Sequence, residues 1–328
     1  MGDTMADRPG HNHGSLIKQA LENGAEPARS ALAASWRRSL SLYGLDPEDQ
    51  GMPQTLTEGQ LREARQAMEP MTRAAQGVLD RLFLAVGDTG CCILLTNADG
   101  VPLERRGAAA DDVAFRRWGL WPGAIWSEAV EGTNGIGTAL AEHRPVTIHR
   151  DQHFHTRNTA LSCTSHPIHD HLGRLAGLLD VSSCRADATE GVLGLIAAAV
   201  ADAARAIEAQ TFRQAFHQAR IVLAGDTGER NTAALLAVDR DDMVIGATRA
   251  ARLALSITDE RIAAQLAASE VLDTGLVEAE LLEAERGAVR RALARTGGNV
   301  SAAAKALGVS RATLHRKLHR LGLSRETH

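Results

Sequence analysis

Six histidines and one cysteine lie close together in residues 149–171, and side chains of these types bind transition metals. They include one His-x-His and one His-x-x-His-x-His spacing. A zinc site needs three or four ligands converging at about 2.0–2.3 Å, which spacing alone does not establish. Metal sensing therefore remains one interpretation. The other is that these histidines are ordinary residues of loops and pockets. The side chains concerned are His149, His153, His155, His166, His169, His171 and Cys163.

Cysteine offers a second kind of chemistry. Cys91 and Cys92 are neighbours in an apolar run that predicts a strand, so their side chains point to opposite faces and form no dithiol pair. A redox sensor needs an exposed thiolate with a lowered pKa, for which Cys163 is the favoured candidate. Thiol-dependent catalysis is a further alternative, but the spacing places no nucleophile–base pair. We therefore expect no enzyme activity.

Lysine use bears on nucleotide chemistry. The chain has three lysines, Lys18, Lys305 and Lys317, and none follows a glycine. A phosphate-binding P-loop requires Gly-Lys-Ser/Thr, because its lysine reaches the nucleotide phosphates. The sequence therefore excludes a Walker-type ATPase.

Positive charge is concentrated at one end of the chain. Residues 286–328 carry a net charge of +9 and the rest −13, which gives the formal −4 of the whole chain. A compact basic segment attached to an acidic body is typical of a nucleic-acid-binding module joined to another domain. The alternative is a solvated basic tail. The residue pattern of the segment decides between the two.

The basic segment has the pattern of a helix-turn-helix. Ala288, Val289, Ala292 and Leu293 form one apolar helix face, and residues 296–299 end that helix. Ser301 is expected to cap a short second helix, Gly308 to supply a positive-φ turn, and Ser310 to cap a third helix that reaches Leu321.

The third helix is expected to enter the major groove of DNA, where side chains in its first turns meet base edges. Arg311 has the donors to read the O6 and N7 atoms of a guanine, and other side chains are placed for phosphates. The predicted DNA-binding residues are Ser301, Ser310, Arg311, Thr313, His315, Arg316, Lys317 and Arg320.

The stretch GNVSAAAKALGVSRATLHRKLHRLG, residues 298–322, resembles the Fis-type helix-turn-helix family. This resemblance implies a homodimer that binds double-stranded DNA at an inverted repeat, with recognition helices about one DNA turn apart. No cofactor is expected for DNA binding.

The upstream chain alternates helical and strand patterns. A polar N-terminus, residues 1–27, is expected to be mobile. Helices are expected over residues 28–43 and 56–84, with an interruption or boundary at Pro70, and over 189–219. Strands are expected at residues 91–95, 145–148, 162–168, 175–181, 233–238 and 243–247, with a short helix at 248–255 and a tight glycine-rich loop within 119–137.

Four strings in this part resemble the GAF sensor domain of acetoin-catabolism regulators, which are sigma-54-dependent activators: GTNGIGTAL, RPVTIHRDQHF, LSCTSHPIHD and LAGLLDVSS. Ser35-Trp36-Arg37-Arg38 also fits, and residues 235–250 resemble that family's degenerate PAS-like segment. These regulators normally carry a central ATPase, which this chain lacks. Recruitment of RNA polymerase, repression, or modulation of a full-length relative remain open as its mode of action.

The resemblance implies a multidomain α+β chain with a GAF-like antiparallel sheet, a small PAS-like segment and an all-α helix-turn-helix domain. We expect N-terminal helices over 28–74, the sensor over 75–210, the PAS-like segment and linker over 211–270, and the DNA-binding domain over 278–325.

Tryptophans crowd beside the glycine-rich stretch, and indoles suit a pocket for a small organic effector. The alternative is packing on the sheet. The predicted pocket residues are Trp118, Trp126, Asn134, His149 and Cys163.

The chain is therefore predicted to be a bacterial one-component transcription regulator that senses a small molecule and hydrolyses no ATP. Metal or redox sensing, or ligand-independent architectural DNA binding, are the alternatives. The longest apolar run, residues 191–200, is far short of the roughly 20 residues of a spanning helix. The polar N-terminus and the cysteine count then predict a cytoplasmic protein with no membrane partner.

Overall fold

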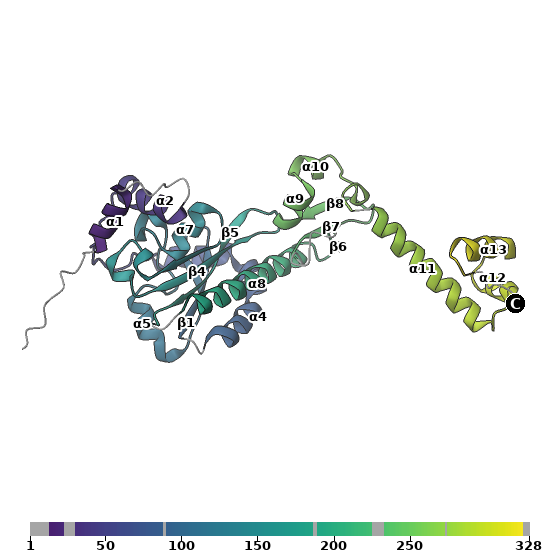
Figure 1. Ribbon diagram of the computed structural model, residues 1–328, viewed down its shortest axis with the longest axis horizontal. Coiled ribbons are helices and arrows are strands. Elements are labelled where there is room, and N and C mark those ends of the chain that lie inside the picture. The colour runs from purple at the N-terminus through teal and green to yellow at the C-terminus, as the bar shows by residue number, and fades with distance from the viewer. Residues whose placement is uncertain are drawn as a thin grey trace, which may run out of the picture.

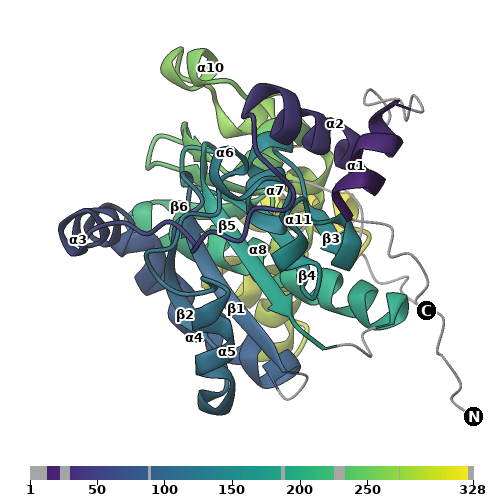
Figure 2. The ribbon, with the colours of Figure 1, turned by 90° about the vertical axis from the view of Figure 1, so that its left-hand side faces the viewer.

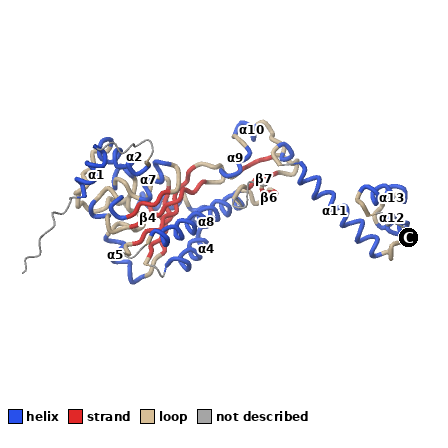
Figure 3. The backbone as a smooth tube through the Cα atoms, viewed as in Figure 1, coloured by secondary structure: helices blue, strands red, loops and turns tan. Residues whose placement is uncertain are grey.

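The computed structural model describes residues 13–22, 30–87, 90–185, 189–224, 233–272 and 274–323. Figure 1 shows an elongated chain in which a large sheet with helices, a small sheet and a helical C-terminal domain follow one another. Figure 3 shows that strands are confined to the first two of these parts. The α+β class with an all-α C-terminal domain is therefore confirmed.

The large sheet is antiparallel throughout, with strand order β2-β1-β5-β4-β3. Because side chains alternate along a strand, Cys91 belongs to the apolar core on one face and Cys92 to the core on the other, as the sequence predicts. The strands are β1 (Cys91–Asn97), β2 (Pro102–Arg106), β3 (Val146–His149), β4 (Ser162–His169) and β5 (Leu175–Ser183).

Two long helices, α4 (Glu69–Val86) and α8 (Glu190–Ala215), cover one face of this sheet (Figure 2). Pro70 lies in the first turn of α4, where its missing N–H leaves no intrahelical bond unmade. It marks a boundary, as predicted, because the preceding helix α3 (Glu58–Ala67) is separate. The predicted helix to residue 219 is too long: α8 ends at Ala215 and a strand begins at Arg220.

The other face is covered by α5 (Asp112–Arg117), α7 (Gly135–Glu142) and the connection between them, which carries the short helix α6 (Glu128–Glu131). The expected glycine-rich loop is wrong at its end, because the last two glycines form the first turn of α7. Asn134 caps that helix by accepting a hydrogen bond from the Gly137 N–H at 2.8 Å. Short 3-10 turns cover Ala109–Asp111, Arg150–Gln152 and Thr156–Asn158.

The N-terminal region is partly ordered against this domain. Residues 13–22 form helix α1, and the other residues of the segment 1–27 lie outside the described part. The expected mobility of that segment stays a prediction. The helix expected over residues 28–43 comprises α2 (Ala31–Arg37) and a π-helix at Arg38–Leu42, and it ends before Gly44 at φ +65°.

A small antiparallel sheet follows α8, with order β6-β7-β8. The last turns of α8 pack on it, because Phe212 shares a buried cluster with Leu235 and Ala237. Its elements are β6 (Arg220–Leu223), β7 (Leu235–Val238), β8 (Val244–Ala247), α9 (Arg249–Leu255), α10 (Asp259–Ala263) and a 3-10 turn at Ala268–Glu270.

Three helices form the C-terminal domain: α11 (Thr274–Arg295), α12 (Val300–Ala306) and α13 (Arg311–Arg320). Ser310 caps α13 as predicted, and Gly308 has φ +69°. The expected cap of α12 is wrong, because Asn299 rather than Ser301 accepts the hydrogen bonds from the first turn.

Gly137→Ala is expected to lower the free energy of unfolding by at least about 2 kcal/mol, because a strained close approach disrupts the packing around α7. A Cβ there would lie 2.5 Å from the Glu128 backbone N and 2.7 Å from the Trp126 carbonyl O. Gly194→Ala, in α8 with nothing within 4 Å, is the matched control. The control substitution is expected to raise the free energy of unfolding by about 0.5–1 kcal/mol, because alanine has the higher helix propensity. Urea unfolding checks both, and equal effects would contradict the packing argument.

Candidate nucleic-acid interface and sensor domain

The recognition helix of the C-terminal domain is fixed by an apolar face. Leu314 and Leu318 of α13 pack with Leu321 against Val289 of α11 and Ala303 of α12, and all five are buried. This packing leaves the opposite side of α13 to solvent.

The structure brings the predicted DNA-binding residues of α13 onto that open side. Arg311, His315 and Arg316 are exposed. Thr313 is half-buried and its hydroxyl bonds that of Ser310 at 2.8 Å, so it is engaged in the helix cap. Ser301 is exposed in the first turn of α12, on a different helix. Contacts between these residues and DNA stay a prediction.

Lys317 and Arg320 already have an anionic partner. The carboxylate of Glu285, on α11, accepts hydrogen bonds from the Lys317 ammonium and from the Arg320 guanidinium. The Lys317 hydrogen bond is the main cause that holds the pKa of Glu285 below its usual range. Sequence reasoning missed this acid, because it directly precedes the basic segment and reads as part of the acidic body.

Cys163 lies in a buried polar cluster of the sensor sheet. His153 Nε2 lies 3.4 Å from its Sγ, and Ser182 Oγ lies 3.1 Å from the same sulfur. Burial, assisted by the negative charge of Asp180, raises the pKa of the Cys163 thiol. Burial likewise lowers the pKa of His153 to about 4, so neither group is poised to form a thiolate–imidazolium pair. The redox-sensing alternative gains no support here.

Asp180, which sequence reasoning also missed, is fully buried in the same cluster. The Ser165 hydroxyl donates to its Oδ1 at 2.5 Å and the Ser182 hydroxyl to its Oδ2 at 2.6 Å. Burial raises the pKa of Asp180 to about 6, because the two hydroxyls only partly replace water around the carboxylate.

The other predicted pocket residues occupy different places. Trp126 is buried in the core, and its indole N–H donates to the Gly119 carbonyl at 2.8 Å. Asn134 is buried as a helix cap, and His149 Nδ1 bonds the Ser162 hydroxyl at 2.7 Å. Trp118 is half-buried and lines a cavity. The structure thus does not gather the five around one opening, and their role in effector binding stays a prediction.

The cavity at Trp118 has a volume of about 520 Å³. It lies between the segment 50–53 and α5, and Arg117, Arg157 and the buried Asn158 also line it. Arg157 is held by Glu131 through two hydrogen bonds, whereas Arg117 is exposed. A cavity lined by an arginine and an aromatic ring suits a small acid or another polar organic molecule.

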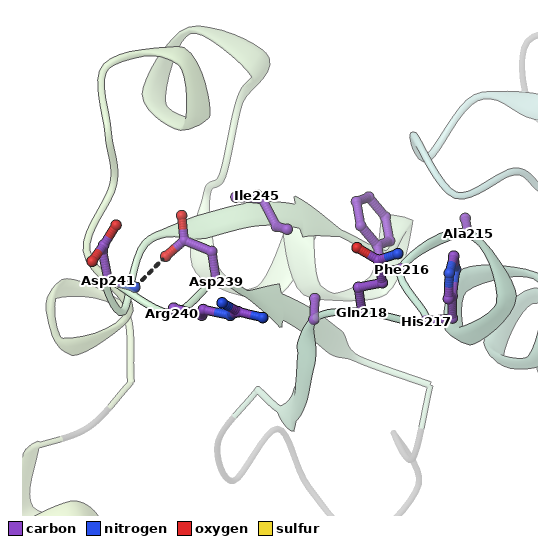
Figure 4. A pocket seen from close by; sticks show the side chains of 9 residues that line it. Ala215, Phe216, His217, Gln218, Asp239, Arg240, Asp241 and Ile245 are labelled. Carbon is purple, nitrogen blue, oxygen red and sulfur yellow. Dashed lines mark hydrogen bonds between the residues drawn. The ribbon is translucent and has the colours of Figure 1, made fainter.

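A second cavity, of about 590 Å³, lies where α8 meets the small sheet. Figure 4 shows Phe216 and His217 at one end and the Asp239–Asp241 turn at the other. The Asp239 carboxylate is engaged by the backbone N–H groups of Asp241 and Met243, so it shapes the turn rather than facing an open site.

The histidines of residues 149–171 are spread over separate environments. His169 Nδ1 bonds Glu208 of α8 at 2.7 Å, and His166 Nδ1 faces the Pro167 carbonyl at 2.8 Å. His155 is buried against Phe154, with ring centroids 5.3 Å apart. Within the described part of the chain, no three His, Cys, Asp or Glu side chains are placed to hold a metal ion. Metal sensing therefore gains no support from this arrangement.

The N-terminal Ser35-Trp36-Arg37-Arg38 motif docks on the sensor domain. Arg38 forms a 2.6 Å ion pair with the buried Glu128 of α6, and Ser35 donates to the same carboxylate. The Trp36 indole N–H donates to the Gln152 carbonyl at 2.9 Å. The motif therefore anchors α2 to the segment that carries α6 and α7.

Thiol labelling tests the redox alternative. In the folded protein at pH 8, iodoacetamide is expected to modify Cys184, which is half-buried, and to spare the three buried thiols Cys91, Cys92 and Cys163. All four should react in urea, which serves as the control, and mass spectrometry identifies the sites. Modification of Cys163 as fast as in urea would contradict its burial and restore redox sensing.

Asp180→Asn tests the buried carboxyl. Because its pKa is raised from 3.8 to about 6, the folded state holds the proton more tightly than the unfolded state. Wild-type stability is therefore lost as pH rises from about 4 to 6. The variant's free energy of unfolding, relative to wild type, should increase by roughly 2–3 kcal/mol between pH 4 and 7.5. The exposed Asp151→Asn is the control, and a flat difference for Asp180→Asn would contradict the raised pKa.

Comparison with known proteins identifies two regions. A family described as "MimR, N-terminal domain" matches residues 12–208, which is more than half of the chain. A family described as "Bacterial regulatory protein, Fis family" matches residues 280–321. Both matches confirm the resemblance to regulators of acetoin catabolism and to Fis-type domains that the motifs predicted.

Curated relatives are longer proteins. The acetoin catabolism regulatory protein of Cupriavidus necator is 35% identical over 224 residues, 67% of this chain and 34% of that protein. The acetoin dehydrogenase operon transcriptional activator AcoR of Bacillus subtilis is 32% identical over 176 residues, 54% of this chain and 29% of that protein. The chain thus matches about a third of the length of these relatives.

A solved structure shares the fold of the N-terminal part. The Escherichia coli DhaR(N)–DhaL complex aligns with a TM-score of 0.50 and 18% identity, over 70% of this chain and 76% of that chain. At this identity the likeness establishes the fold alone.

Proposed function

Since the chain belongs to the MimR N-terminal domain family and also carries a Fis-family domain, we propose that it is a DNA-binding transcription regulator. The observation that carries the proposal is the open side of α13. Arg311, His315 and Arg316 are exposed there, while the apolar side of the helix is buried against α11 and α12. A basic helix held in this way by a Gly-containing turn is the element that enters the major groove.

The proposed reader is a homodimer at an inverted repeat. One recognition helix spans only a half-site, so a second copy is needed to contact the next groove about one DNA turn away. The charge distribution supports this role, because the +9 segment concentrates cations where the phosphates pass.

The proposed regulator acts without hydrolysing ATP. Helix α11 begins at Thr274, directly after the small sheet and its 3-10 turn, and the sequence contains no Gly-Lys-Ser/Thr. It therefore affects transcription by occupying DNA or by contacting RNA polymerase or a full-length relative. No described helix is long and apolar enough to cross a membrane.

The proposed signal is a small polar organic molecule bound by the N-terminal domain. The cavity at Trp118 supports this proposal, because it has the volume of a small-ligand site and both Trp118 and Arg117 line it. A bound effector shifts the regulator only as far as its affinity differs between the two states.

Two substitutions test the assignment of α13. A duplex selected from a random library serves as the specific site, and fluorescence anisotropy gives its affinity over a range of salt. Arg311→Ala should cost about 1–3 kcal/mol on that site and relax the choice of one base. Lys317→Ala should weaken specific and random duplexes alike and reduce the salt slope by about one.

The exposed Arg62→Ala, on α3 in the N-terminal domain, removes one positive charge far from α13 and is the control. If Arg311→Ala and Lys317→Ala behave alike, α13 is not the base-reading helix. If the wild-type chain binds neither duplex, the proposed function itself is wrong.

A further inference from the structure

One acidic residue holds two of the cations that face DNA in the proposed function. Glu285 lies on α11, and its Oε1 and Oε2 accept hydrogen bonds from Lys317 and Arg320, respectively. The three side chains are 23%, 33% and 59% exposed, so water and DNA can reach them. The contact joins the first helix of the C-terminal domain to the helix that is proposed to enter the DNA groove.

The carboxylate of Glu285 accepts hydrogen bonds from the same donors that would bind a DNA phosphate. Both anions present oxygens to the same N–H donors, so a DNA phosphate must displace or share Glu285 before it pairs with Lys317 or Arg320. Lys317, Arg320 and Glu285 together carry a net charge of +1, whereas the two cations alone carry +2. By contrast, Arg311 and Arg316 make no ion pair with any residue that the structure describes.

We propose that Glu285 competes with DNA phosphates for Lys317 and Arg320 and so sets the sequence-independent share of DNA affinity. This inference rests on the proposed DNA-binding function. The competition lowers affinity for every sequence, while the exposed Arg311 is left to read bases. The affinity for DNA of arbitrary sequence is then lower, because phosphate contacts contribute less to it. The base contacts supply a larger share of the affinity for a specific site.

Glu285→Gln tests the proposal, because it keeps the shape of the side chain and removes its charge. The variant should bind random and selected duplexes about 3- to 10-fold more tightly near 0.1 M salt. The slope of log K against log salt should steepen by about 0.9, the value of one further phosphate contact. Glu63→Gln, on exposed α3, makes the same change in net charge away from α13 and should leave both quantities unchanged.

A double-mutant cycle identifies the route of the effect. In a chain that already carries Lys317→Gln and Arg320→Gln, Glu285→Gln should change neither affinity nor slope. Persistence of the tightening in that background would show a general electrostatic effect and overturn the proposal.

The opposite outcome is equally decisive. If Glu285 serves to clamp α13 in place, Glu285→Gln will weaken DNA binding without steepening the salt slope, and the inference is wrong. Circular dichroism of each variant shows that the helices remain folded. Failure of the wild-type chain to bind random or selected DNA would instead overturn the proposed function on which the inference rests.

Discussion

The sensor domain depends on how closely the first turn of α7 approaches the sheet. A Cβ at Gly135 would lie 2.7 Å from the Cβ of Cys163, and one at Gly137 would lie 2.5 Å from the Glu128 backbone. Only glycine therefore lets this turn touch β4 and the α6 segment together. The same approach places Asn134 where it caps α7 and also donates to the Trp126 carbonyl at 3.1 Å. The first turn of α7 therefore holds β4, the segment that carries Trp126 and α6, and α7 itself together.

The N-terminal helices depend on that point in turn. Glu128 is buried because α6 is pressed against α7, and a buried carboxylate needs a cation and donors. Ser35 of α2 supplies a donor and Arg38 of the π-helix supplies the cation. The Ser35 and Thr133 hydroxyls are also hydrogen-bonded, at 2.7 Å. The approach of α7 to the sheet therefore explains both the glycine-rich motif and the Ser-Trp-Arg-Arg motif, which lie about a hundred residues apart in sequence.

Periodicity predicted the fold well where one residue pattern decided the structure. The alternation of Cys91 and Cys92 and the positive φ of Gly308 are local properties, and both are as expected. The sequence could not assign the cap of α12, because Asn299 and Ser301 are both good caps and only the backbone entry angle selects one. It also missed Asp180 and Glu285, because Ser165 lies 15 residues from Asp180 on the next strand and Arg320 lies 35 residues from Glu285 on another helix.

The packing also limits how the two ends can communicate. Trp126 and Cys163 fill the sheet face with the protein's own side chains, so a ligand that bound among them would have to displace the core. A ligand in the proposed cavity at Trp118 would instead meet the connections around α5 without displacing that core. The N-terminal and C-terminal domains are connected through α8, whose last turns pack on the small sheet, and then through α11 (Figure 1). Since Glu285 lies on α11 and pairs with two cations of α13, the proposed DNA-binding surface depends on how α11 sits against α13.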